Sequence, residues 1–339
     1  MNINTVANFL ERAGLTWLAP IVRLCVGDDP RTQLRTLGFL VGVPLCAIAL
    51  FLTLWQLTAA GVQTSLGSIP GPAAVWSAFS GLVESHQLER AKAAQFYARQ
   101  IERNAERVQT DPTAQTSIHA WTGKPTFFDQ VATSLKTVFT GFLIATLLAV
   151  PLGILCGTSR IIQTALNPLI QIFKPVSPLA WLPIVTLAVS AVYTTENGWF
   201  EKSFITSAIT VTLCSLWPTL INTAVGVGAV DKDLINVARV LKLSWFTRIR
   251  KIVIPSALPL IFTGLRLSLG VGWMVLIAAE MLAQNPGLGK FVWDEFQNGS
   301  GQSLGRMMVA VLVIGLIGFM LDRVMQTLQQ LTSHSEPRT

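Results

Sequence analysis

The chain of 339 residues is strongly apolar: 51% of its residues are hydrophobic, 13% are charged and its mean hydropathy is +0.53. Soluble domains carry about 25% charged residues, so this composition excludes disordered, fibrous and small disulfide-rich proteins. The net charge of +7 does not indicate nucleic-acid binding, because the basic residues lie at the ends of apolar runs and form no patch. The sequence predicts an all-α polytopic membrane protein.

Six apolar runs are long enough to cross a hydrocarbon core of about 30 Å as helices. They cover about residues 37–58, 131–156, 169–192, 205–230, 257–282 and 307–325. The first run is longer than the apolar region of a secretory signal, about 7–15 residues, so we expect it to remain as a span. The predicted segments are 1–35 (inner), 36–59 (first span), 60–130 (outer helical insert), 131–325 (five-span core with an inner loop at 229–256) and 326–339 (inner tail).

The orientation follows from the Lys and Arg residues of the short loops. With the N-terminus inside, the inner segments hold thirteen of them, whereas the short outer loops hold Lys202, Lys290 and Arg306. Because Lys and Arg are enriched on the cytoplasmic side, we expect both termini in the cytoplasm.

The outer insert has its own helical pattern. Residues 69–72 form an Ile-Pro-Gly-Pro turn from which a short helix starts at Ala73, and residues 84–109 are polar and free of Gly and Pro. Closely spaced opposite charges support a solvated helix there. Two interpretations are open: a solvent-facing hairpin, or a docking surface for a soluble partner.

The chain carries no sign of an enzyme. It lacks the phosphate-binding G-x-x-x-x-G-K-[ST] loop, its three histidines are far apart, and its four cysteines have no metal-ligand spacing. We therefore predict no catalytic residue, no metal site and no cofactor in this chain. Transport work would draw on another chain or on an ion gradient.

The inner loop between the fourth and fifth spans contains a short amphipathic helix. Leu234, Val237, Ala238 and Leu241 share one helical face, and a basic stretch follows before Pro255. Such a helix lies along the inner membrane surface, with or without a partner.

This loop resembles the cytoplasmic coupling loop of permease subunits in binding-protein-dependent ABC importers. Their pattern is Glu-Ala-Ala, three residues, Gly, nine residues and Ile-x-Leu-Pro; here Asn236-Val237-Ala238, Lys242 and residues 252–255 occupy these positions. Asn236 replaces the acid and Lys242 replaces the glycine. A lysine in the left-handed conformation of such a turn costs on the order of 1 kcal/mol.

Other stretches are similar to the nitrate/sulfonate/taurine group of these permeases. They are residues 69–75, 174–183, 264–281, 286–289 and 315–322. The charged insert around residues 96–99 with residues 123–129 is similar to the nitrate permeases. The resemblance covers about residues 36–325.

The resemblance implies the type I ABC importer permease fold in a bacterial inner membrane. It further implies a second permease copy, two cytoplasmic ATP-binding subunits that hold ATP and Mg²⁺, and a periplasmic substrate-binding protein. The coupling residues would be Leu234, Asn236, Val237, Ala238, Arg239, Leu241 and Lys242. The expected substrate is nitrate or nitrite; taurine, sulfonate, cyanate or bicarbonate are alternatives. A gradient-driven anion carrier or channel, and a membrane enzyme, are rivals from other classes.

Ionisable residues inside spans are costly and mark functional sites. Lys136 and Glu280 lie toward the outer side, where a mutual salt bridge is one explanation. Lys174 is about 9 Å inward from Pro168, within reach of the inner surface. Arg266 is about 14 Å inside its span, near the midplane, and no acid is expected at its depth. A cation there suits an anion path, although backbone carbonyls would satisfy it equally well.

The third span carries Pro175, Pro178 and Pro183. Each interior proline removes a helical hydrogen bond, so we expect this helix to be kinked or broken beside protein or a water-filled cavity. Trp181 and Trp273 lie at comparable depth on the third and fifth spans and would narrow such a cavity, or pack between helices. The predicted substrate pathway is Arg266, Lys174, Trp181, Trp273 and Glu280.

Overall fold

The computed structural model describes residues 18–25, 29–64, 67–110, 116–193 and 200–332. Within these ranges the regular secondary structure is helical apart from a small antiparallel pair, β1 (Gln63–Thr64) and β2 (Gly67–Ser68). The helices are α2 (Leu18–Cys25), α3 (Pro30–Leu37), α4 (Val43–Gly61), α5 (Pro72–Thr110), α6 (Phe127–Thr158), α7 (Arg160–Phe173), α8 (Pro178–Val192), α9 (Lys202–Gly228), α10 (Lys232–Val240), α11 (Trp245–Arg248), α12 (Ile254–Ala283), α13 (Leu288–Asn298) and α14 (Ser303–Thr332). The π-helical turns η1 (Gly38–Gly42) and η3 (Ile249–Val253) join α3 to α4 and α11 to α12.

The predicted spans are confirmed. Among the described residues, five helices are long and apolar enough to cross a membrane, and a sixth span is present if α7 and α8 are counted as one. The third span is broken, with α7 and α8 bent by 100°. The prolines explain the break, because Pro175 and Pro178 have no N–H to donate and the chain closes instead with a tight Val176 N to Phe173 O bond of 3.2 Å.

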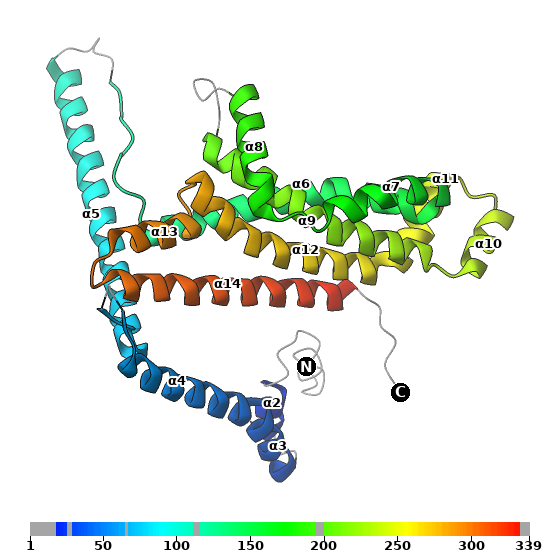
Figure 1. Cartoon of the computed structure of the whole chain (residues 1–339), viewed down its shortest axis with the longest axis horizontal. Coiled ribbons are helices and arrows are strands. Elements are labelled where there is room, and N and C mark those ends of the chain that lie inside the picture. Colours follow the sequence, from blue (N-terminus) through cyan, green and yellow to red (C-terminus); the bar gives the residue numbers. More distant parts are fainter. Residues whose placement is uncertain (1–17, 26–28, 65–66, 111–115, 194–199, 333–339) are drawn as a thin grey trace.

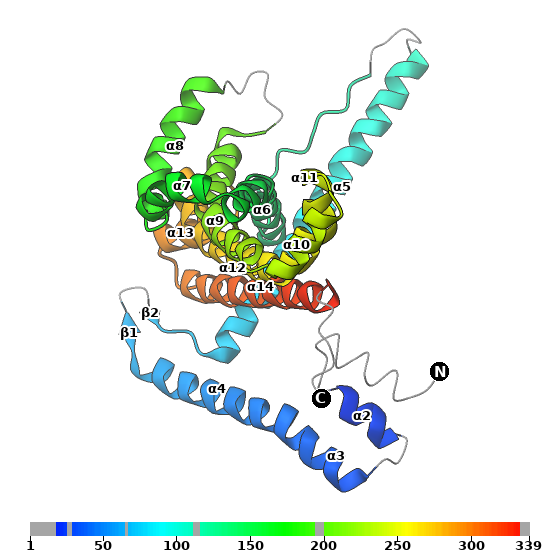
Figure 2. The ribbon, with the colours of Figure 1, turned by 90° about the vertical axis from the view of Figure 1, so that its right-hand side faces the viewer.

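The core of the bundle is α9, which lies between α6 and α12 (Figures 1 and 2). Close approach on the α6 side depends on the glycine pair Gly153 and Gly157. A Cβ at either position would overlap the side chain of Thr223 or Val227 and a backbone carbonyl of α9. Small residues four apart let membrane helices approach closely, and the two glycines do so here.

The outer insert is built on one long helix. The short helix expected at Ala73 and the polar helix expected at 84–109 are a single 39-residue helix, α5, because the polar stretch continues the first without an interior proline. Its first half packs on α14 and α6, and its second half projects beyond the bundle (Figure 1). The chain then returns along α5 to the start of α6.

The first span stands apart from the other spans. None of its most apolar window is buried within the chain, and Figure 2 shows α4 separated from α14 along most of its length. Contact with the bundle is made near its outer end, where Trp55 packs on the main core. The remaining surface of this helix is available to lipid or to another chain.

Candidate functional site

The inner loop folds into two short helices joined by a tight turn at one end of the bundle (Figure 1). The Asp231 side chain caps α10 by accepting from Asp233 N at 2.8 Å. At the other end, Leu243 N donates to Ala238 O and Lys242 N donates to Arg239 O, both at 3.0 Å. This bond pair is a Schellman motif, which satisfies the last carbonyls of a helix and reverses the chain.

Lys242 occupies the left-handed position of that motif, with φ of 49°. Glycine is the usual residue there because it has no Cβ to clash. The turn of the permease pattern is therefore formed even though lysine replaces glycine. Ser244 then caps α11 by accepting from Thr247 N at 3.3 Å, which starts the second short helix.

The fold buries one residue of the predicted apolar face of the loop and leaves the others exposed. Ala238 is 1% exposed, so it faces the rest of this chain and is not available to a partner. Leu234, Val237 and Leu241 are exposed, and sequence reasoning missed Val240, which is 81% exposed. We call the exposed apolar side chains Leu234, Val237, Val240, Leu241, Trp245 and Phe246 the inner apolar patch.

Replacing Lys242 with glycine is expected to leave transport unchanged or raise it. Lys242→Gly removes a left-handed lysine and with it a strain of about 1 kcal/mol, while the two Schellman bonds use only backbone atoms. Lys242→Val, whose branched side chain tolerates a positive φ poorly, is expected to lower transport. The measurement is substrate uptake by the assembled transporter; equal loss in both variants would show that the lysine side chain itself is needed.

Arg266 is paired, and the expectation that no acid lies at its depth is wrong. Its Nε and Nη2 donate to Asp322 Oδ1 and Oδ2 at 2.5 and 2.8 Å, which links α12 to α14. Asp322 falls inside the predicted span 307–325, so the signal was present in the sequence. The pair borders a hollow of about 200 Å³ lined also by Trp273, Met274 and Gly318.

Glu280, on α12, is fully buried, and its carboxylate caps the start of α13. Its carboxylate accepts from Ser134 Oγ at 2.8 and 2.9 Å and from Gly289 N at 3.0 Å. The salt bridge suggested with Lys136 is wrong, because Lys136 is exposed on α6 and no ion pair found among the described residues includes it. The carboxylate instead satisfies donors at a helix N-terminus and ties α13 to α6 and α12.

The two tryptophans of the predicted pathway lie in different places. Trp273 is buried and its Nε1 donates to Ile314 O at 3.0 Å, so it packs between α12 and α14. Trp181 lies at the start of α8, where its ring contacts Phe173 with centroids 5.7 Å apart. Phe173 also stacks on Trp217 of α9, which sequence reasoning did not single out. The structure therefore does not bring Trp181 and Trp273 to one cavity.

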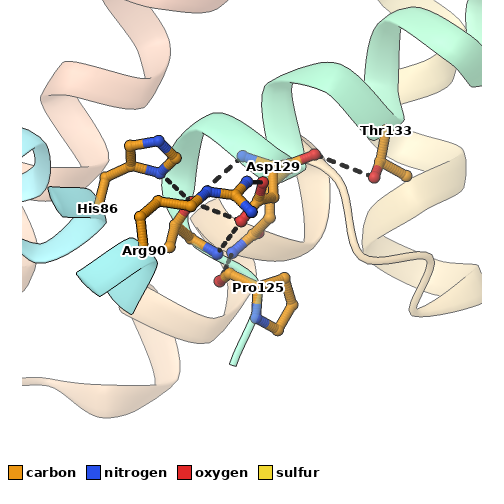
Figure 3. A network of polar contacts seen from close by, with 7 residues as sticks. His86, Arg90, Pro125, Asp129 and Thr133 are labelled. Atoms are coloured by element: carbon orange, nitrogen blue, oxygen red, sulfur yellow. Dashed lines mark hydrogen bonds and ion pairs between the residues drawn. The ribbon is translucent and has the colours of Figure 1, made fainter. Parts of the chain in front are cut away.

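The base of the outer insert is held by a polar network (Figure 3). His86 Nδ1 lies 2.7 Å from Thr126 Oγ1, and Arg90 forms an ion pair with Asp129. Thr126 and Asp129 make a reciprocal capping box at the start of α6. The insert is thereby joined to the first turn of a membrane-spanning helix.

Side chains of α5 hold the returning chain farther out. Gln100 pairs with the backbone of His119 through both its amide atoms, at 2.8 and 3.1 Å. Tyr97 Oη accepts from Trp121 N at 3.0 Å, and the Phe96 and Trp121 rings have centroids 5.1 Å apart. We call residues 98–119, beyond these aromatic contacts, the outer arm.

A bundle of apolar helices packed around α9, with a broken span at its side and an apolar patch at one end, is typical of a multi-span membrane permease. Comparison with known protein families shows which class of permease it is. The family model of the binding-protein-dependent transport system inner membrane component matches residues 149–334. The chain belongs to this family, the permease subunits of ABC importers.

Individual relatives cover different shares of the chain. The nitrate import permease protein NrtB of Leptolyngbya laminosa is 39% identical over 195 residues, which span 58% of this chain and 65% of that protein. The bicarbonate transport system permease protein CmpB of Synechocystis sp. is 32% identical over 295 residues, 85% of this chain and 87% of that one. Among solved structures, the inward-facing MetNI methionine ABC transporter is similar, with a TM-score of 0.53 and 15% identity over 61% of this chain and 96% of that chain.

Proposed function

We propose that this chain is the permease subunit of an ABC importer for a small inorganic anion, with nitrate or nitrite as substrate. The observation that carries the proposal is the inner loop, whose turn and apolar patch suit contact with an ATP-binding subunit. The named relatives import nitrate or bicarbonate, and bicarbonate is therefore the second candidate. The chain itself is non-catalytic in this proposal.

In the assembled transporter, two copies of this chain would enclose the path and two cytoplasmic subunits would bind ATP and Mg²⁺. Closing of the ATP-binding pair would push α10 and α11, and through η3 the movement would pass directly into α12. Residues 245–283 are one continuous helix, which supports such rigid transmission. α14 ends on the side of the bundle where α10 lies (Figure 1), and this arrangement fits a cytoplasmic C-terminus.

Uptake into proteoliposomes tests the substrate and the energy source together. The complete complex with its binding protein should accumulate labelled nitrate when ATP is supplied to the ATP-binding subunits, and nitrite should compete. Accumulation of bicarbonate without nitrate would select the second candidate. Nitrate uptake by the permease without ATP-binding subunits would instead identify a gradient-driven carrier or channel.

The outer arm is proposed to hold the periplasmic binding protein. Its residues 98–110 continue α5 beyond the bundle (Figure 1) and carry several charged side chains. Replacing residues 98–119 with a short Gly-Ser linker is structurally reasonable, because Tyr97 and Trp121 already touch and the network at Arg90 and Asp129 stays intact.

Without the outer arm, ATPase activity stimulated by the binding protein is expected to fall at least about tenfold, since docking would lose more than about 1.4 kcal/mol. Basal ATPase activity should stay at the level of the unaltered transporter, because the arm lies outside the bundle. Titration of binding protein against ATPase rate makes the measurement. Equal stimulation with and without the arm would mean that the arm is a solvent-facing hairpin and does not bind the binding protein.

A further inference from the structure

The break between α7 and α8 lies close to the middle of the bundle. Phe173, the last residue of α7, stacks on Trp217 with ring centroids 6.3 Å apart and an interplanar angle of 8°. Trp217 is about 22 Å along α9, a helix of about 40 Å at 1.5 Å per residue. Lys174, the next residue after Phe173, is therefore held near the middle of α9, deeper than the position about 9 Å inward from Pro168 that was expected from the sequence.

Two indole groups at this break have unused donors. The Nε1 atoms of Trp181 and Trp217 are both buried and have no hydrogen-bond partner among the described residues, whereas Trp273 Nε1 donates to a carbonyl. Phe173 contacts both unpaired indoles. A buried N–H group without an acceptor is unfavourable, so each of these donors suits a ligand that brings an acceptor.

Lys174 brings a positive charge to the break. Lys174 is exposed, and it takes part in no ion pair found within the described ranges. The N-terminal end of α8 faces the same break, and it carries the positive end of the helix dipole. Half-helix N-termini at middle depth are where membrane transporters bind anionic groups.

We propose that this break is a binding station for a small oxyanion on its way through the membrane. Lys174 supplies the charge, Trp181 and Trp217 supply neutral N–H donors, and Phe173 holds the two indole rings. One cation with neutral donors attracts an anion without trapping it, as conduction requires. The inference rests on the proposed function and names the part of the chain that handles its substrate. The break takes the place of Arg266, whose charge is paired with Asp322.

Removing one indole N–H at a time tests the station. Trp181→Phe and Trp217→Phe keep an aromatic ring beside Phe173, and each should lower nitrate uptake by the reconstituted complex about tenfold, the effect of one hydrogen bond to a charged acceptor. Basal ATPase activity should be kept. Trp76→Phe, at an exposed position on α5, is the matched control and should transport normally. Normal uptake in both Trp181→Phe and Trp217→Phe would overturn the proposal.

A charge-sensitive label reports on the break without measuring transport. Ala180 is exposed in the first turn of α8, and Ala180→Cys in a chain without its other cysteines offers one thiol there. An anionic methanethiosulfonate reagent should modify this thiol faster than a cationic one, and nitrate should slow the reaction. Lys174→Gln should abolish the anionic preference. A thiol that neither reagent reaches, or equal rates with Lys174 present, would overturn the proposal.

The two experiments separate this station from the proposed function. If the complex accumulates nitrate normally while the tryptophan and lysine variants change nothing, the station is wrong and the proposed function stands. If the Lys174-dependent preference is present but the complex does not transport nitrate, the station is upheld and the assigned substrate is wrong.

Discussion

Val237→Glu is expected to lower transport at least about 100-fold while leaving the permease inserted in the membrane. The side chain lies on the inner apolar patch, exposed in this chain and proposed to be covered by an ATP-binding subunit. An unpaired charge buried at such a contact costs about 3–5 kcal/mol. Uptake should therefore be lost together with the binding-protein stimulation of ATP hydrolysis, measured on the same preparation.

A matched substitution separates coupling from general damage. Val62→Glu makes the same change at an exposed valine beyond α4, at the other end of the first span, and should transport normally. Ala238→Glu is not a suitable probe, because Ala238 is buried within its own loop and a charge there would disrupt the loop itself. Normal uptake by Val237→Glu would show that the patch does not contact an ATP-binding subunit.

Breaking the pair of Arg266 and Asp322 is expected to reduce the amount of assembled complex at least about tenfold. Each single change, Arg266→Gln or Asp322→Asn, leaves one charge alone near the midplane, where an unpaired ionised group costs at least about 2.5–3.5 kcal/mol. The pair is 37% and 44% exposed in the single chain, so it must be covered by another chain or by water. Detergent-extracted complex is quantified by size-exclusion chromatography.

A variant that lacks both charges distinguishes a role of the Arg266–Asp322 pair in assembly from a role in transport. Arg266→Gln with Asp322→Asn removes both charges and should restore assembly and nitrate uptake to near the unaltered level, because amide side chains can still bond across α12 and α14. Restored assembly with absent uptake would instead show that Arg266 acts on the anion. That outcome would place the substrate path at Arg266, as expected from the sequence.

The spans and the amphipathic inner loop follow from the sequence alone. A backbone in hydrocarbon must satisfy its own hydrogen bonds, so an apolar run of about 20 residues has essentially one solution, a helix. The prolines at 175 and 178 likewise predicted the broken third span, which the structure contains. The resemblance of residues 236–255 to a coupling loop implied a turn at Lys242 but left open whether lysine could form it. The structure contains that turn, since a Schellman motif depends on backbone hydrogen bonds.

The pairing of polar side chains between helices, by contrast, could not be read from the sequence. Arg266 pairs with a residue 56 positions away, and Glu280 bonds to Ser134 instead of Lys136. The tertiary structure also buried Ala238 and stacked Phe173, the residue before Lys174, on Trp217. The physical reason is that lipid and protein interior are equally apolar, so a membrane helix carries little periodicity to show which face it buries, and its rotation and neighbours are set by packing across the bundle.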